Sequence, residues 1–261
     1  MDTPSSRIQD SLITTGFSVA ICTGVHLVVK PLWRKAVGEK KYTSLKKRER
    51  IYLAEKTVSS LNAIVTGGLA LYAITSGSYA GDVVYPYPKA AHYALAFVCG
   101  YSLYDTTVMA LGAHEPPIMW AHHILGLGGA FAMMCYRELS FFPVAFAVSE
   151  LTVLPINLVW YLNKLGISRK SRRMRAALLA RAIAFLTLRA PIGLLTFAYA
   201  HTNTKGGLQA LWRRLFVNKE VNQFVSRAAA FNVSAFTIMN LLWTYQAVKV
   251  AMQVEIDSKE E

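Results

Sequence analysis

Apolar residues in this chain gather into long runs, and polar residues gather between them. A helix needs about 20 predominantly apolar residues to cross the hydrocarbon core of a bilayer. Seven runs are long enough or nearly so: 11–29, 57–79, 90–112, 117–136, 140–162, 176–200 and 224–252. The connections between them are too short to fold separately. The pattern predicts an all-α, polytopic membrane protein with about seven transmembrane helices.

Composition supports this interpretation. Hydrophobic residues make up 54% of the chain and charged residues only 16%, and the mean hydropathy is +0.32. Soluble domains have about 25% charged residues. The first run follows a mildly polar segment and leads into a basic one, without a small-residue cleavage site. We therefore expect a retained anchor helix instead of a cleaved signal peptide.

The net charge of +13 is concentrated in two segments. Ten of the 28 basic residues lie in 30–56, and six more lie in 163–175. If the chain crosses seven times, both segments lie on the same face of the membrane. Lys and Arg are enriched in cytosolic loops, so this face is expected to be cytosolic. The N-terminus is then lumenal and the C-terminus cytosolic. We expect the basic segments to bind anionic lipid headgroups, not nucleic acid.

The pair His122-His123 is the most unusual feature of the apolar runs. A rise of about 1.5 Å per helical residue places both histidines ~8–10 Å below the cytosolic surface, and Asp105 of the preceding span ~10 Å below it. Ionisable groups are costly in a bilayer and by default indicate function. Neighbouring helical residues point ~100° apart. One histidine can therefore act as base or nucleophile while the other orients it or binds Asp105.

Three later spans bring further polar groups to the same half of the membrane. Glu150, Arg189 and Asn240 come out ~18–20 Å from the cytosolic face, and Asn157 lies two turns from Glu150 on much the same side of its helix. These groups can neutralise one another only if they face a common interior. A purely structural ion pair between Glu150 and Arg189 is an equal alternative to a functional role.

Other sequence signals refine this interpretation. Pro155 and Pro191 should kink their helices and open space between them. Adjacent histidines diverge on a helix, unlike the i, i+4 pair of a zinc site, so we expect no metal. No Gly-rich phosphate loop is present, and no bound cofactor is expected.

Several short motifs in order along the chain resemble the TLC-domain family of endoplasmic-reticulum membrane proteins, which includes the ceramide synthases. The similarity extends from about residue 56 to residue 249 and is closest to the small TLC-domain transmembrane proteins. The matching residues are Lys56-Thr-Val-Ser59, Gly100-Tyr-Ser-Leu-Tyr-Asp105, His122-His123, Ser149-Glu150-Leu151, Pro155-Ile-Asn157, Arg189 and Met239-Asn-Leu-Leu-Trp243.

The resemblance implies six helices around a central lipid-sized cavity, preceded here by one anchor helix. We accordingly divide the chain into a tail and anchor (1–29), a basic cytosolic loop (30–55), a TLC domain (56–252) and a cytosolic tail (253–261). In ceramide synthases the residues corresponding to His122 and His123 catalyse acyl transfer from acyl-CoA to a sphingoid amine. The present chain retains Glu150 but lacks the Ser-Tyr and the paired aspartates of the synthase motif.

Three hypotheses follow for function. The first is a protein of the endoplasmic reticulum that binds or senses lipid and acts in lipid homeostasis. The second is an acyltransferase that uses acyl-CoA as co-substrate, and the third, an ion transporter, lacks the expected inverted repeat. Membrane lipids, including sphingoid bases or fatty acyl-CoA, are the expected partners. The candidate catalytic residues are His122, His123 and Asp105, and the candidate lipid- or substrate-binding residues are Tyr101, Glu150, Asn157, Arg189 and Asn240.

Overall fold

The computed structural model describes residues 3–112 and 115–257, and within these ranges all regular structure is helical. Helices of different lengths follow one another along the chain. They are α1 (Pro4–Val37), α2 (Glu39–Ser44), α3 (Lys47–Thr75), α4 (Lys89–Gly112), α5 (Pro117–Tyr136), α6 (Phe141–Ala147), η1 (Val148–Thr152), α7 (Val153–Lys164), α8 (Arg172–Ala184), η2 (Phe185–Arg189), α9 (Ile192–Thr202), α10 (Gly207–Trp212), η3 (Arg213–Val217) and α11 (Gln223–Asp257).

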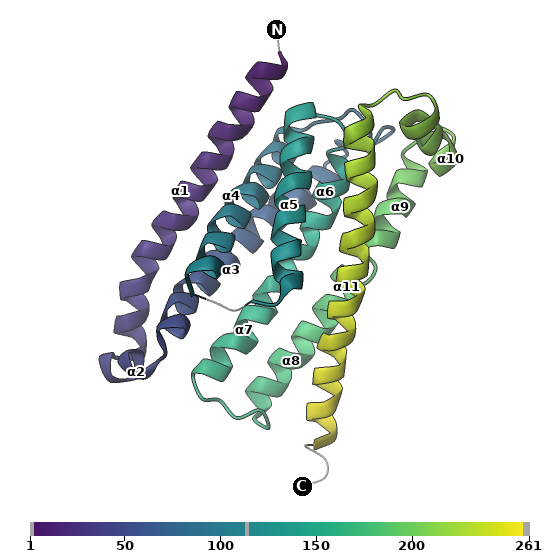
Figure 1. The fold of residues 1–261 in the computed structure, drawn as a ribbon. Coiled ribbons are helices and arrows are strands. Elements are labelled where there is room, and N and C mark those ends of the chain that lie inside the picture. The colour runs from purple at the N-terminus through teal and green to yellow at the C-terminus, as the bar shows by residue number, and fades with distance from the viewer. Residues whose placement is uncertain (1–2, 113–114, 258–261) are drawn as a thin grey trace.

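These helices form a bundle whose long members run up and down, with the two termini at opposite ends (Figure 1). Among the described residues, six helical segments are long and apolar enough to cross a membrane. They are α1, α3, α4, α5, the run from α6 to α7 and the run from α8 to α9. Helix α11 adds a seventh pass alongside them (Figure 1). The predicted fold class is therefore confirmed.

Helix α1 packs outside the other helices, against α3, α4 and α5. Its buried face consists of small or polar residues, whereas large apolar side chains such as Phe17 and Leu27 are exposed. Membrane helices pack in this way because lipid covers apolar side chains as well as protein does, and small residues allow close approach. The buried residues are Ser11, Thr15, Ser18 and Cys22.

Two of the long passes are interrupted just before their prolines. Pro155 follows the 3₁₀ segment η1, and Pro191 follows the π-helical segment η2, in which the Ala190 amide donates to the Phe185 carbonyl 2.8 Å away. Proline has no N–H and clashes with the carbonyl four residues earlier, so the regular hydrogen-bond pattern cannot continue there. Such interruptions are frequent at functional sites. Segments η1 and η2 contact each other.

Both basic segments lie at the same end of the bundle, which we call the basic end and which comprises residues 38–46 and 165–171. The Lys41 ammonium donates to the Leu165 carbonyl (3.2 Å), and Lys164 forms a 2.6 Å ion pair with Glu49. Most of the segment 30–55 is helical, because α1 continues to Val37 and α3 already begins at Lys47. The segment 253–261 likewise begins within α11, and its residues 258–261 lie outside the described part of the chain.

The opposite end carries α10, η3 and the segment 76–88. Arg214 connects them, since its guanidinium donates to Asp82 (3.1 Å) and to Glu220 (3.0 Å) and lies over the Tyr85 ring. Tyr79 and Val84 of the segment 76–88 are fully buried. These contacts close the bundle at this end.

Candidate functional site

His123 and Asp105 are in direct contact between α5 and α4. His123 Nε2 lies 2.8 Å from Asp105 Oδ2, and both side chains are almost completely buried. A carboxylate this close to a ring nitrogen favours one orientation of the imidazole. Asp105 Oδ1 is buried without a hydrogen-bond partner among the described residues. Asp105 therefore still has acceptor capacity after it has bound His123.

His122 points toward α11. Its ring packs edge-on against Phe236 and Trp243, with centroid distances of 5.2 Å in both cases, and its Nδ1 is buried without a hydrogen-bond partner in the described structure. The two imidazole rings are also 5.2 Å apart and nearly perpendicular. One histidine is thus anchored by a carboxylate, and the other keeps an unused ring nitrogen.

Arg189 in η2 forms hydrogen bonds with neutral partners. Its Nε donates to Thr152 Oγ1 (2.5 Å) and its Nη1 to Asn240 Oδ1 (3.2 Å). For Glu150, within the described ranges, no hydrogen bond or ion pair is found, and a Glu150–Arg189 ion pair does not form. Asn240 Nδ2 is buried and lacks an acceptor among these residues. The arginine therefore connects three helical segments, and Glu150 and the Nδ2 group of Asn240 are unpaired in the described ranges.

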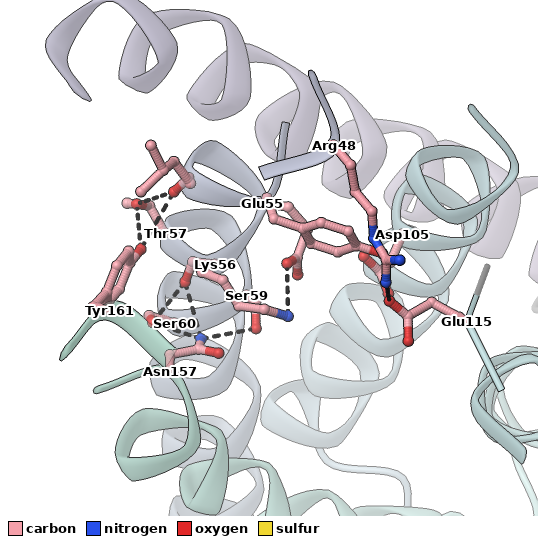
Figure 2. A network of polar contacts seen from close by, with 12 residues as sticks. Arg48, Glu55, Lys56, Thr57, Ser59, Ser60, Asp105, Glu115, Asn157 and Tyr161 are labelled. Atoms are coloured by element: carbon pink, nitrogen blue, oxygen red, sulfur yellow. Dashed lines mark hydrogen bonds and ion pairs between the residues drawn. The ribbon is translucent and has the colours of Figure 1, made fainter. Parts of the chain in front are cut away.

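Asn157 and Tyr101 both bind to α3, as Figure 2 shows for Asn157. The Asn157 amide donates to the Lys56 carbonyl (3.0 Å) and to the hydroxyls of Ser59 (3.1 Å) and Ser60 (2.9 Å), so it holds α7 against α3. The Tyr101 hydroxyl donates to Glu55 Oε1 (3.1 Å). The tyrosine ring packs on His123 at a centroid distance of 5.8 Å.

Two cavities meet at these residues. The first, which we call the chamber, is a mostly apolar cavity between α3, α4, α5, α6, η1 and α11. The second, the vestibule, is more polar than the chamber, and charged residues of α3, α4, η1, α8 and η2 line part of it. The residues that line both cavities are Tyr101, His122, His123 and Glu150.

The chamber has the features of a ligand site. Small-molecule sites are commonly concave and mainly apolar, with a few polar groups that fix orientation. Gly126 borders the chamber between Val98, Ser102 and Phe236, each about one van der Waals contact from where a Cβ would lie. Because glycine has no side chain, space remains inside the chamber at this position.

All eight residues predicted from sequence line one or both of the cavities, and Asn157 in addition joins two helices. Glu55 was missed from sequence, because it was assigned to a basic loop. It is only 1% exposed and lies on the buried face of α3 together with Ser59, Asn62 and Thr66. That i, i+4, i+7, i+11 spacing of polar residues was the available signal, since polar side chains of membrane helices face the protein interior.

This arrangement is suited to proton transfer or nucleophilic chemistry beside a bound apolar chain. An imidazole oriented by a carboxylate is a typical general base, and a second imidazole with a free nitrogen can accept a proton or an acyl group. Among the described residues no group of three His, Cys, Asp or Glu side chains is placed to hold a metal ion.

Comparison with known proteins identifies one family. The TLC domain matches residues 53–249, about three quarters of the chain. No curated protein and no solved structure gives a significant match. The match covers every residue of the cavity junction, and the chain therefore belongs to the TLC-domain family.

Proposed function

We propose that this protein binds a lipid in its intramembrane cavity and acts in lipid homeostasis in the endoplasmic reticulum. The observation that carries the proposal is the junction, at His122 and His123, of an apolar chamber with a more polar vestibule lined by charged side chains. A molecule with one apolar chain and one polar head matches this pairing. Such molecules reach the site from the surrounding bilayer.

Unsatisfied polar atoms at the junction support a polar head group in the ligand. His122 Nδ1, Asp105 Oδ1 and Asn240 Nδ2 are all buried without partners in the described ranges. An unpaired buried polar group costs about 1–3 kcal/mol. A carbonyl, hydroxyl or amine of a bound lipid would remove part of this cost.

We further propose that the basic end faces the cytosol, with the N-terminus in the lumen. Lys41 and Lys164 at this end, with the other basic residues of 30–56 and 163–175, follow the bias of cytosolic loops. They also suit the anionic headgroups of that leaflet. The vestibule contacts Lys56 near the start of α3 and therefore opens toward the same side.

Native mass spectrometry of the purified full chain tests lipid binding. The wild type is expected to retain one lipid, and Gly126→Leu to lose it because the new side chain fills the chamber. Gly128→Leu is the matched control, since Gly128 is exposed and no atom lies within 4 Å of where its Cβ would be. Equal lipid retention by both variants would refute the proposed site.

The alternative function is acyl transfer from acyl-CoA. The 2.8 Å contact of His123 with Asp105 and the free Nδ1 of His122 favour it. In such a step a histidine removes the proton of an amine or alcohol while the acceptor attacks the thioester carbonyl. The C–S bond breaks, and the proton passes to the departing CoA thiolate.

Lipidomics of cells that lack the protein distinguishes the two functions. Rescue by the wild type but not by His122→Ala/His123→Ala supports catalysis, provided that the variant reaches the membrane in normal amount. Rescue by both forms supports binding without chemistry. Formation of a defined lipid by the purified protein from acyl-CoA and an amine or alcohol would replace the first proposal with the second.

A further inference from the structure

Glu55 is a carboxylate buried at the edge of the histidine site. Its side chain is 1% exposed, and its two oxygens have different partners. Oε1 accepts the hydrogen bond from the Tyr101 hydroxyl (3.1 Å), and Oε2 lies 2.8 Å from the Lys56 ammonium. Figure 2 shows this ion pair on α3, with Asp105 in the same view.

Lys56 lines the vestibule together with Asp105 and is close enough for the two charges to interact. It also interacts with Glu115, but that carboxylate is already bound by the Tyr52 hydroxyl (2.6 Å) and by Arg48 (3.3 Å). Asp105 Oδ1, in contrast, has no partner among the described residues. Within the described ranges Glu150 is also unpaired in the vestibule, but it is not among the charges that act on Lys56. If Lys56 lost Glu55, Asp105 would therefore be the anion most available to it.

We propose that Glu55 is a positioning residue that retains Lys56 and so reserves Asp105 for His123. The vestibule contains three acidic and three basic side chains: Glu55, Asp105, Glu150, Lys56, Arg181 and Arg189. Opposite charges in a partly buried site attract strongly, and an ammonium without a counter-ion takes the nearest free carboxylate. Glu55 therefore keeps the charges paired locally, and the second partner of Glu55, Tyr101, packs on the ring of His123.

Glu55→Gln isolates the charge effect. A glutamine retains a carbonyl oxygen for the Tyr101 hydroxyl, so the neutral hydrogen bond survives, but the attraction for Lys56 is lost. Lys56 then binds Asp105 Oδ1 and draws this carboxylate away from His123 Nε2. Glu55→Gln/Lys56→Met removes both charges and leaves the contact between His123 and Asp105 undisturbed.

Site-resolved acylation by diethyl pyrocarbonate measures the reactivity of the His123 ring, which should rise when Asp105 no longer contacts its Nε2. The full chain is reacted in lipid nanodiscs without added ligand, and fragment-ion mass spectrometry separates His123 from His122. His201, at the other end of the bundle, is the internal reference. Because the assay reads the contact itself, its result does not depend on whether the protein binds lipid or transfers an acyl group.

We expect Glu55→Gln to raise the rate at His123 about threefold or more, the range typical of directly coupled residues, without a change at His201. The double variant should react at the wild-type rate. An unchanged rate in Glu55→Gln, or an equally raised rate in the double variant, would overturn the proposal. If Glu55→Gln does not fold, the test depends on the double variant alone. The proposal then requires the double variant to fold and to react at the wild-type rate, and any other result overturns it.

Discussion

Arg189 is the best example of how single residues hold this site together. Its guanidinium is buried at the meeting point of η1, η2 and α11, and it depends on neutral acceptors. A buried charged donor that loses its acceptor costs more than a neutral one. The acceptors of Arg189 should therefore be among the most sensitive polar positions in the chain.

Thr152→Val tests this at the residue scale. Thr152 is fully buried, and valine has nearly the same shape but cannot accept the bond from Arg189 Nε. We expect a loss of about 1–3 kcal/mol in the free energy of unfolding, measured as a lower melting temperature in lipid nanodiscs. Thr187→Val is the control, because the Thr187 hydroxyl is exposed and bonds only within its own helix. Similar melting of both variants would contradict this role.

The residues of the site were more predictable than their pairing. Depth in the membrane follows from topology and the rise per residue, which is why Asp105 and His123 could be placed at one level from sequence. Which histidine binds Asp105 depends on how α5 is rotated about its axis against α4, and a single sequence does not contain that angle. Glu55 was missed because the basic residues around it conceal the start of α3.

At the scale of elements, a close glycine contact joins α1 to α4. A Cβ at Gly100 would lie 2.3 Å from Ser18 Cβ and 2.9 Å from the Ser18 carbonyl carbon. Helix α4 carries Tyr101 and Asp105, so this glycine also determines how closely the anchor helix supports the site. Nearby, the Tyr104 hydroxyl lies 2.6 Å from His26 Nδ1 of α1.

Gly100→Ala should push α1 and α4 apart. We expect a destabilisation of about 1–3 kcal/mol, as for other overpacked contacts, again measured by thermal unfolding in nanodiscs. Gly24→Ala on the outer face of α1 meets no atom within 4 Å and should leave the melting temperature unchanged or slightly higher. A stable Gly100→Ala variant would show that α1 does not pack as described.

The elements at the end opposite the basic end should respond to acid. Hydrogen bonds from Asn218 and Arg214 hold the pKa of the exposed Glu220 carboxylate below its usual value. Because this pKa is lower in the folded protein, the bonds stabilise the fold at pH values above the pKa of the carboxyl in the unfolded chain, about 4.3. The stabilisation is lost as the pH falls through the folded-state pKa.

Amide hydrogen exchange of residues 213–221 should therefore accelerate between pH 6 and pH 3, after correction for intrinsic rates. Glu220→Gln is neutral at both pH values, so this variant should lack the part of the acceleration that comes from Glu220. If wild type and variant show the same pH dependence, the bonds to Glu220 do not stabilise this segment.

The prolines show what the sequence could indicate about elements. Pro155 and Pro191 predicted irregular helices near Glu150 and Arg189. They did not predict that one interruption would be 3₁₀ and the other π-helical, because that choice depends on the packing of η1 against η2. The positions of the breaks follow from the local sequence, whereas their 3₁₀ or π-helical geometry depends on tertiary packing.

At the scale of the whole molecule, the hydrophobic pattern predicted the number of passes and the common end of the two basic segments. It could not predict a chamber, since this cavity is defined by residues from six separate segments and by the absence of a side chain at Gly126. The family resemblance supplied that expectation. The structure adds where the chamber ends: at the junction near His122, and near Met133 and Phe142 toward the opposite end.

The most direct test of lipid binding in the chamber is photocrosslinking of single-chain lipids to the full chain in nanodiscs. Two probes carry a diazirine, one near the polar head and one near the end of the chain. We predict that the head-proximal probe labels residues around His122 and Asn240, and that the chain-end probe labels Met133 or Phe142. Gly126→Leu should abolish both labels. Labelling confined to outward-facing residues such as Ile124 and Leu242, and unaffected by Gly126→Leu, would contradict lipid binding in the chamber.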